Sequence, residues 1–134
     1  MEHKIFRLNL ASPLFYIPDS WQEPFNCPAD GERLFCFALN EAQYRNFEPD
    51  GAELLGNLIF SGKAGKEGAS IELPAGDYFF AQEKRLLNRE EIINMIVEIQ
   101  KETLWQRFRP ADKLYLRYLF EDGNWVTQIF RPYS

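Results

Sequence analysis

Histidine and cysteine are scarce in this chain of 134 residues. The single histidine is His3, and the two cysteines are Cys27 and Cys36. Histidine is the side chain that most often performs acid–base chemistry near neutral pH, so no internal Ser–His or Cys–His pair can be assembled. Two separated cysteines are also a poor ligand set for zinc. These absences favour a binding role over catalysis, and we expect no catalytic residues, no metal and no cofactor.

Long apolar runs and an excess of basic residues are also missing. The stretch from Met1 to Ile5 is too polar for a secretion signal, and no run approaches the roughly 18 residues of a membrane span. Lys and Arg number 15 against 20 Asp and Glu, a net charge of −5. Nucleic-acid binding needs clustered cations. We therefore expect a cytoplasmic protein with reduced thiols, whose partner is neither a nucleic acid nor a membrane.

Glycine is concentrated between Gly62 and Gly68, but the spacing there is not that of a phosphate-binding loop. Such a loop needs a glycine five positions before its Gly-Lys pair, and a serine or threonine directly after it. Phe60 and Glu67 occupy those two positions. The stretch therefore predicts a surface connection and no nucleotide site.

Aromatic residues are plentiful. They make up 16% of the chain, with 12 Phe, 6 Tyr and 3 Trp, and apolar residues reach 46%. The length suits a single domain spanning residues 1–134, which can bury a core without a disulfide or metal. Aromatic side chains beyond the needs of that core favour a ligand pocket or a partner surface.

A long helix is predicted after Asn88. Asn88 is a good N-cap residue, and Glu91 stands three positions later, as in a capping box. Apolar residues then recur at helical spacing from Ile92 to Phe108, and Pro110 ends the pattern. A second, short helix is possible at 41–47, after Asn40.

Extended segments surround this helix. In the first of them Phe6, Leu8 and Leu10 form the uniformly apolar set, which we expect to point inward. The segment 14–17, bracketed by prolines, is expected to be an edge strand, and 70–73 is expected to pair with 54–61. The further strands are predicted at 33–39, where Cys36 should be a buried small hydrophobe, at the Tyr78-Phe79-Phe80 run that follows Gly76, and at 114–120 and 127–132.

The last two strands form a hairpin whose register follows from its turn. Asp122-Gly123 is a strong two-residue turn signal. Counting outward pairs Phe120 with Trp125, Tyr118 with Thr127 and Leu116 with Ile129 on a face able to cover the helix. The opposite face places Arg117 among aromatic and aliphatic residues. A cation there needs a partner, either a carboxylate or an anionic group of a ligand, unless it lies half exposed and stacks on its neighbours.

The segment Leu73-Pro74-Ala75-Gly76-Asp77-Tyr78-Phe79 resembles the start of the second half of GyrI-like domains, the effector-binding fold of some multidrug-sensing regulators. The resemblance extends over residues 70–134, to the ending Arg131-Pro132. It implies two βαββ halves that form a curved sheet with a hydrophobic cleft between them. Relatives of this kind bind small molecules, some bind a protein, and a minority hydrolyse substrates. Binding members often carry a glutamate on the next-to-last strand, whereas Leu114–Tyr118 contains no acid.

Together these patterns predict an α+β domain with a curved antiparallel sheet, one long helix and βαββ-type units. The leading functional hypothesis is a stand-alone domain that binds a small amphipathic or aromatic molecule in an aromatic-lined cleft. The candidate ligand-binding residues are Phe35, Phe37, Tyr78, Phe80, Trp105, Tyr115, Arg117 and Tyr118. The alternative is a protein–protein interaction module without catalytic activity.

Overall fold

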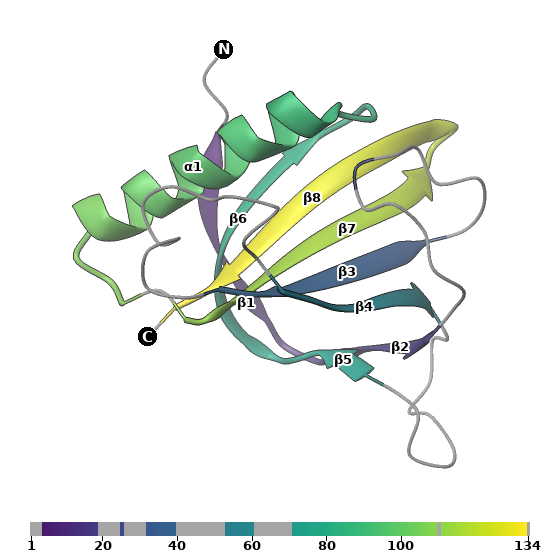
Figure 1. The fold of residues 1–134 in the computed structure, drawn as a ribbon, viewed down its shortest axis with the longest axis horizontal. Helices are drawn as coiled ribbons and strands as arrows, with labels where there is room; N and C mark the ends of the chain where they lie inside the picture. The colour runs from purple at the N-terminus through teal and green to yellow at the C-terminus, as the bar shows by residue number, and fades with distance from the viewer. Residues whose placement is uncertain are drawn as a thin grey trace.

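The computed structural model describes residues 4–18, 25, 32–39, 53–60, 71–109 and 111–133. Within these ranges one antiparallel sheet and one helix confirm the expected α+β class (Figure 1). The elements are β1 (Ile5–Leu10), β2 (Leu14–Pro18), β3 (Arg33–Ala38), β4 (Glu53–Phe60), β5 (Ile71–Leu73), β6 (Gly76–Glu83), α1 (Arg89–Trp105), β7 (Lys113–Glu121) and β8 (Asn124–Pro132). The possible helix at 41–47, the glycine-rich stretch at 62–68, His3 and Cys27 lie outside the described residues.

The eight strands follow the order β1-β6-β8-β7-β3-β4-β2-β5, and every pairing is antiparallel. The two ends of this order are connected through the chain, because β1 leads into β2 and β5 leads into β6. Tyr16 of β2 is paired with Phe60 of β4 on one side and with Ile71 of β5 on the other. The chain therefore passes twice between the two ends of the sheet. β1 is followed by β2, which pairs with the last strand β5, and β5 is followed by β6, which pairs with β1.

Two expectations about strand position are wrong. The segment 14–17 is not an edge, because β2 pairs with both β4 and β5. For the same reason β5 does not pair with β4, which was the expected partner of 70–73. The prolines permit this arrangement since Pro13 precedes the strand and Pro18 is its last residue, where a missing N–H group is tolerated.

The helix begins as predicted and ends earlier. The backbone N–H of Glu91 donates to the Asn88 side chain at 2.9 Å, and the Glu91 carboxylate accepts from the Asn88 backbone at 3.2 Å. The expected continuation to Phe108 is wrong, because α1 ends at Trp105. Phe108 lies beyond the helix, and its ring packs on those of Phe79 and Tyr133.

The sheet has two buried faces. We call the face that carries α1 the near face and the opposite one the far face (Figure 1). The near-face core joins the helix to the sheet through Phe35, Phe37, Leu39, Phe79, Ala81, Leu87, Ile92, Met95, Ile96, Ile99, Leu114, Leu116, Tyr118 and Ile129. The far-face core consists of Tyr16, Leu34, Cys36, Leu73, Tyr78, Phe80, Tyr115 and Phe130. Burial on both sides explains why strands such as β3 read as nearly continuous apolar runs.

The hairpin register and most of the inward-facing set of β1 are confirmed. β7 and β8 pair Phe120 with Trp125, Tyr118 with Thr127 and Leu116 with Ile129, as counted from the Asp122-Gly123 turn. On β1, Leu8 and Leu10 pack against the far-face core, whereas the Phe6 side chain remains 45% exposed. Cys36 is buried as expected.

Candidate functional site

Six of the seven predicted ligand-binding aromatic residues, all except Trp105, are buried and divided between the two faces of the sheet. Each of these six is at most 9% exposed. The near-face core contains Phe35, Phe37 and Tyr118. The far-face core contains Tyr78, Phe80 and Tyr115. Successive side chains of a strand point to opposite sides, so Tyr115 and Tyr118 of β7 cannot line one surface. The expectation that all these residues share one cleft is therefore corrected.

Trp105 belongs to neither core. It is the last residue of α1, and its side chain is 83% exposed. Trp21 lies outside the described residues.

Arg117 has a carboxylate partner, which was the first of the two alternatives for it. Its Nε and Nη2 atoms donate to Glu32 Oε2 at 3.0 and 2.8 Å. The same Nε donates to the Tyr16 hydroxyl at 3.0 Å, and Nη1 donates to Gln128 Oε1 at 3.0 Å. The side chains of Arg117 and Glu32 are only 15% and 17% exposed, so this ion pair is stronger than one in open solvent.

The group of Tyr16, Glu32, Gln82, Arg117 and Gln128 is named here the polar cluster. Gln128 Nε2 donates to Gln82 Oε1 at 3.0 Å, and the Tyr16 hydroxyl donates to Glu32. Burial raises the pKa of Tyr16, the nearby guanidinium of Arg117 lowers it, and the hydrogen bond to Glu32 raises it again. The net shift is upward, so Tyr16 stays a neutral donor and the cluster carries one positive and one negative charge.

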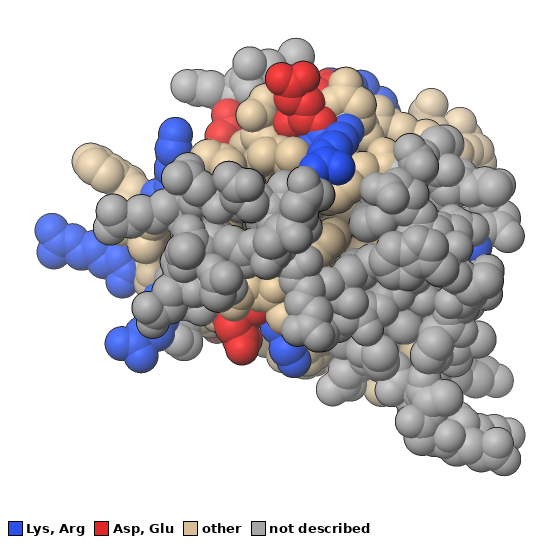
Figure 2. All heavy atoms as spheres, viewed as in Figure 1, with Lys and Arg blue, Asp and Glu red and all other residues tan. Residues whose placement is uncertain are grey.

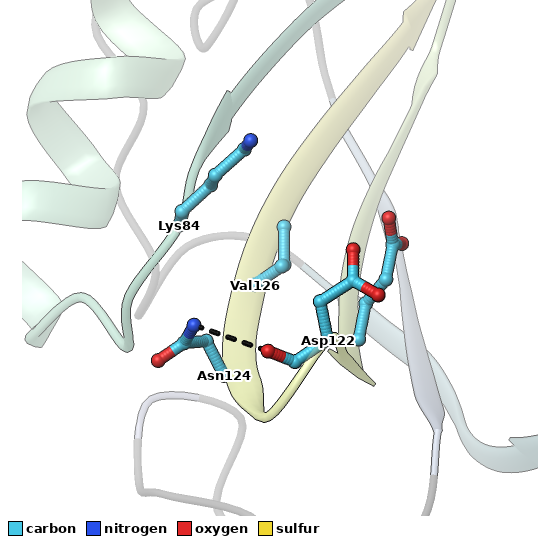
Figure 3. Close-up of a pocket in the computed structure, with 5 residues that line it drawn as sticks. Lys84, Asp122, Asn124 and Val126 are labelled. Carbon is cyan, nitrogen blue, oxygen red and sulfur yellow. Dashed lines mark hydrogen bonds between the residues drawn. The ribbon is translucent and has the colours of Figure 1, made fainter.

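A cavity of about 100 Å³ opens at the hairpin end of the far face. It is lined by Lys84, Glu121, Asp122, Asn124 and Val126. Figure 3 shows Lys84 on the β6 side and Asp122 on the β7 side, with Val126 of β8 between them. The Asn124 side chain donates to the backbone carbonyl of Asp122 at 3.4 Å and so stays close to the turn.

The cavity continues the surface of the polar cluster. Because side chains alternate along a strand, Val126 lies on the same side of β8 as Gln128, and Glu121 on the same side of β7 as Arg117. The registers place Gln128 opposite both Arg117 and Gln82. Along the far face, the aromatic core is thus followed by the polar cluster, and the polar cluster by an open cavity with two carboxylates and one ammonium group. No pattern in the sequence predicted this cavity, although the Asp122-Gly123 turn marks its position.

The far-face core also contains a buried thiol, that of Cys36. Cys36 is opposite Tyr115 in the register of β3 and β7. Burial raises the pKa of the Cys36 thiol to about 11, and it also raises the pKa of Tyr115. A thiol in this state is a poor nucleophile near neutral pH. Within the described residues, no three His, Cys, Asp or Glu side chains gather to hold a metal ion.

Comparisons with known proteins leave the family open. No model of a protein family matches the chain, and no curated protein sequence matches it. Among the described residues, no helix combines the length and apolar character that crossing a bilayer requires.

Proposed function

We propose that this chain is a small-molecule-binding domain whose ligand enters the cavity at the hairpin end of the far face. The observation that carries the proposal is the lining of that cavity. It combines the apolar side chain of Val126 with the charged groups of Lys84, Glu121 and Asp122. A concave site with a few convergent polar groups on an apolar floor is the usual form of a ligand site.

The charge of the lining favours a cationic ligand group. Glu121 and Asp122 contribute two negative charges against the one positive charge of Lys84. Arg117 does not change this balance, because its charge is compensated by Glu32. The excess of negative charge attracts an amine and repels a carboxylate or phosphate. Glu121, the last residue of β7, thus supplies an acid on the next-to-last strand, although it lies closer to the turn than Leu114–Tyr118, which contain none.

The volume of the cavity limits how much of the ligand it encloses. Sites that enclose a drug-sized molecule measure roughly 300–1,000 Å³, whereas this cavity measures about 100 Å³. It therefore accepts the head group of a small amphipathic amine, with the apolar part of the ligand remaining outside or lying across the hairpin.

The strand pairings support a GyrI-like arrangement of two βαββ halves in a curved sheet. β2 pairs with β4 as β6 pairs with β8, and β3 pairs with β4 as β7 pairs with β8. The two halves meet where β3 pairs with β7. In the second half α1 follows β6, and the corresponding interval of the first half is the segment around residues 19–32. The proposed relation to GyrI-like domains is an analogy of fold, and the cavity argument does not need it.

The proposal is tested by nuclear magnetic resonance titration of the full chain with small alkyl and aryl amines. Each amine is compared with the alcohol of the same carbon skeleton. We expect saturable shifts at Lys84, Glu121 and Asn124 with the amines, and much weaker shifts with the alcohols. Glu121→Gln and Asp122→Asn remove charge without changing side-chain shape, and each should weaken amine binding several-fold.

Asp112→Asn is the matched control, because Asp112 is an exposed acid that precedes the opposite end of β7. It should leave amine binding unchanged. Absence of saturable shifts with every amine, or equal affinities for wild type and Glu121→Gln, would refute the proposed site.

A further inference from the structure

The C-terminal end of α1 exposes an unusually large apolar side chain. Trp105 is 83% exposed and its neighbour Leu104 is 37% exposed. Earlier in the helix, Ile96 and Ile99 are fully buried. Tryptophan is enriched at the energetic centre of protein interfaces, and neither core of the described residues contains Trp105.

The backbone next to Trp105 is held in a conformation that suits glycine. Arg107 has φ of +64°, in the left-handed region. Its N–H donates to the Leu104 carbonyl at 3.0 Å and the Phe108 N–H donates to the Thr103 carbonyl at 3.1 Å, which is the Schellman arrangement. Glycine is the residue that usually occupies this position, because a side chain makes the left-handed region less favourable. The chain thus accepts local strain at an exposed arginine two residues after Trp105.

Further cations surround the same turn. Lys101 lies one helical turn before Trp105, and the exposed Arg109 follows Phe108. The guanidinium of Arg7 stacks over the Phe108 ring at 5.2 Å. Figure 2 shows Lys and Arg side chains projecting at the left of the view, where α1 ends in Figure 1. The nearby acid Glu102 accepts a hydrogen bond from Gln106 at 2.7 Å. The cations Arg7, Lys101, Arg107 and Arg109 outnumber this acid, so this end is locally basic in a chain whose net charge is −5.

We propose that Lys101, Trp105, Arg107 and Arg109, named here the tryptophan tip, bind an acidic segment of a partner protein. The indole provides the apolar anchor, and the cations provide charge complementarity to aspartate and glutamate side chains. This surface is separate from the hairpin cavity, which is lined by residues of β7, β8 and the turn between them, and by Lys84 after β6.

A protein segment fits the tip better than a membrane or a nucleic acid. Anionic lipid surfaces and phosphate backbones are extended polyanions that repel a molecule of net charge −5 as it approaches. One tryptophan is also a small apolar anchor for a bilayer. A short acidic segment meets only the local cations, and it can wrap around a convex tip.

The test uses the full chain as bait for a random peptide library displayed on phage. We expect enrichment of peptides that combine Asp or Glu with an apolar residue. Selected peptides, synthesised with a fluorescent label, should bind Trp105→Ala at least about tenfold more weakly than wild type. Phe120→Ala is the matched control, because Phe120 is a 58% exposed aromatic residue on the hairpin, and it should bind as wild type does.

Substitutions of Arg107 should change peptide binding and fold stability in opposite directions. Arg107→Gly and Arg107→Asn both suit the left-handed conformation and remove the charge. Each should raise the melting temperature by about 2–5 °C while weakening peptide binding several-fold. A substitution that merely damaged the fold would lower both the melting temperature and the affinity for the peptide.

Three results would overturn the proposal. The first is a selection that enriches no acidic peptide. The second is equal peptide binding by wild type and Trp105→Ala. The third is Trp105-dependent binding to phosphatidylserine vesicles or double-stranded DNA with no binding to the acidic peptides.

Discussion

The guanidinium of Arg117 and the carboxylate of Glu32 form a two-pronged contact, in which Nε and Nη2 both donate to one oxygen, at 3.0 and 2.8 Å. The contact joins β7 to the residue that precedes β3, although 85 positions separate the two in the sequence. It also orients the Tyr16 hydroxyl of β2. Three segments of the far face are therefore held together by one charged group.

Breaking this ion pair should destabilise the fold. Arg117→Met removes the guanidinium and leaves the Glu32 carboxylate without its charged partner in a largely buried position. We expect the free energy of unfolding in urea to fall by about 1–3 kcal/mol. Glu32→Gln should cost a similar amount. The double variant should lose less than the sum of the two, and strictly additive losses would mean that the two side chains are not coupled.

The capping box at the start of α1 should contribute measurably to stability. Asn88→Ala removes the acceptor for the Glu91 N–H and should lower the free energy of unfolding by about 1 kcal/mol. Asn88→Asp keeps an acceptor in place and serves as the control, with an expected change close to zero. Urea unfolding followed by circular dichroism measures both, and an equal loss in the two variants would argue against the cap.

Substitution of Gly123 measures the energetic cost of backbone strain in the hairpin turn, because no steric clash adds to that cost. Its φ is +81°, and an added Cβ would meet no atom within 4 Å. Gly123→Ala should therefore cost about 1 kcal/mol through conformation alone. Gly123→Asn should cost less, because asparagine tolerates the left-handed region. A melting temperature for Gly123→Ala equal to that of wild type would show that the turn adopts another conformation.

The buried thiol predicts a loss of stability at alkaline pH. The pKa of Cys36 rises from its ordinary value of 9.0 to about 11 on folding, through burial. Above pH 9 the unfolded chain releases this proton while the folded chain retains it, so stability should fall as pH rises from 9 to 11. Tyr16 and Tyr115, whose pKa values are also raised, act in the same direction at higher pH.

Urea unfolding measured between pH 8 and pH 11 checks this dependence. Cys36→Ala should be less stable at every pH because it leaves a small cavity, yet its stability should fall less steeply across this range. Identical slopes for the two proteins would contradict the assignment to Cys36. Iodoacetamide should also label the Cys36 peptide of the native protein far more slowly than that of the urea-unfolded protein, as followed by mass spectrometry.

Local interactions explain which elements the sequence determined by itself. The Asn88 and Glu91 pair specifies the start of α1, because a capping box depends only on residues three positions apart. The Asp122-Gly123 turn specifies the complete register of β7 and β8, because a two-residue turn leaves a single way to pair the strands that flank it. The α+β class followed from these signals and from the alternation of apolar residues.

Tertiary structure alone decided the position of β2 between β4 and β5, the partner of Arg117 and the division of the predicted aromatic residues between two cores. Each depends on segments far apart in the chain, and alternation of side chains shows that a strand has two faces without showing what covers either one. A strand buried on both sides contains apolar residues on both, so Tyr115 and Tyr118 look equivalent in the sequence. Only the packing of α1 on one face distinguishes them.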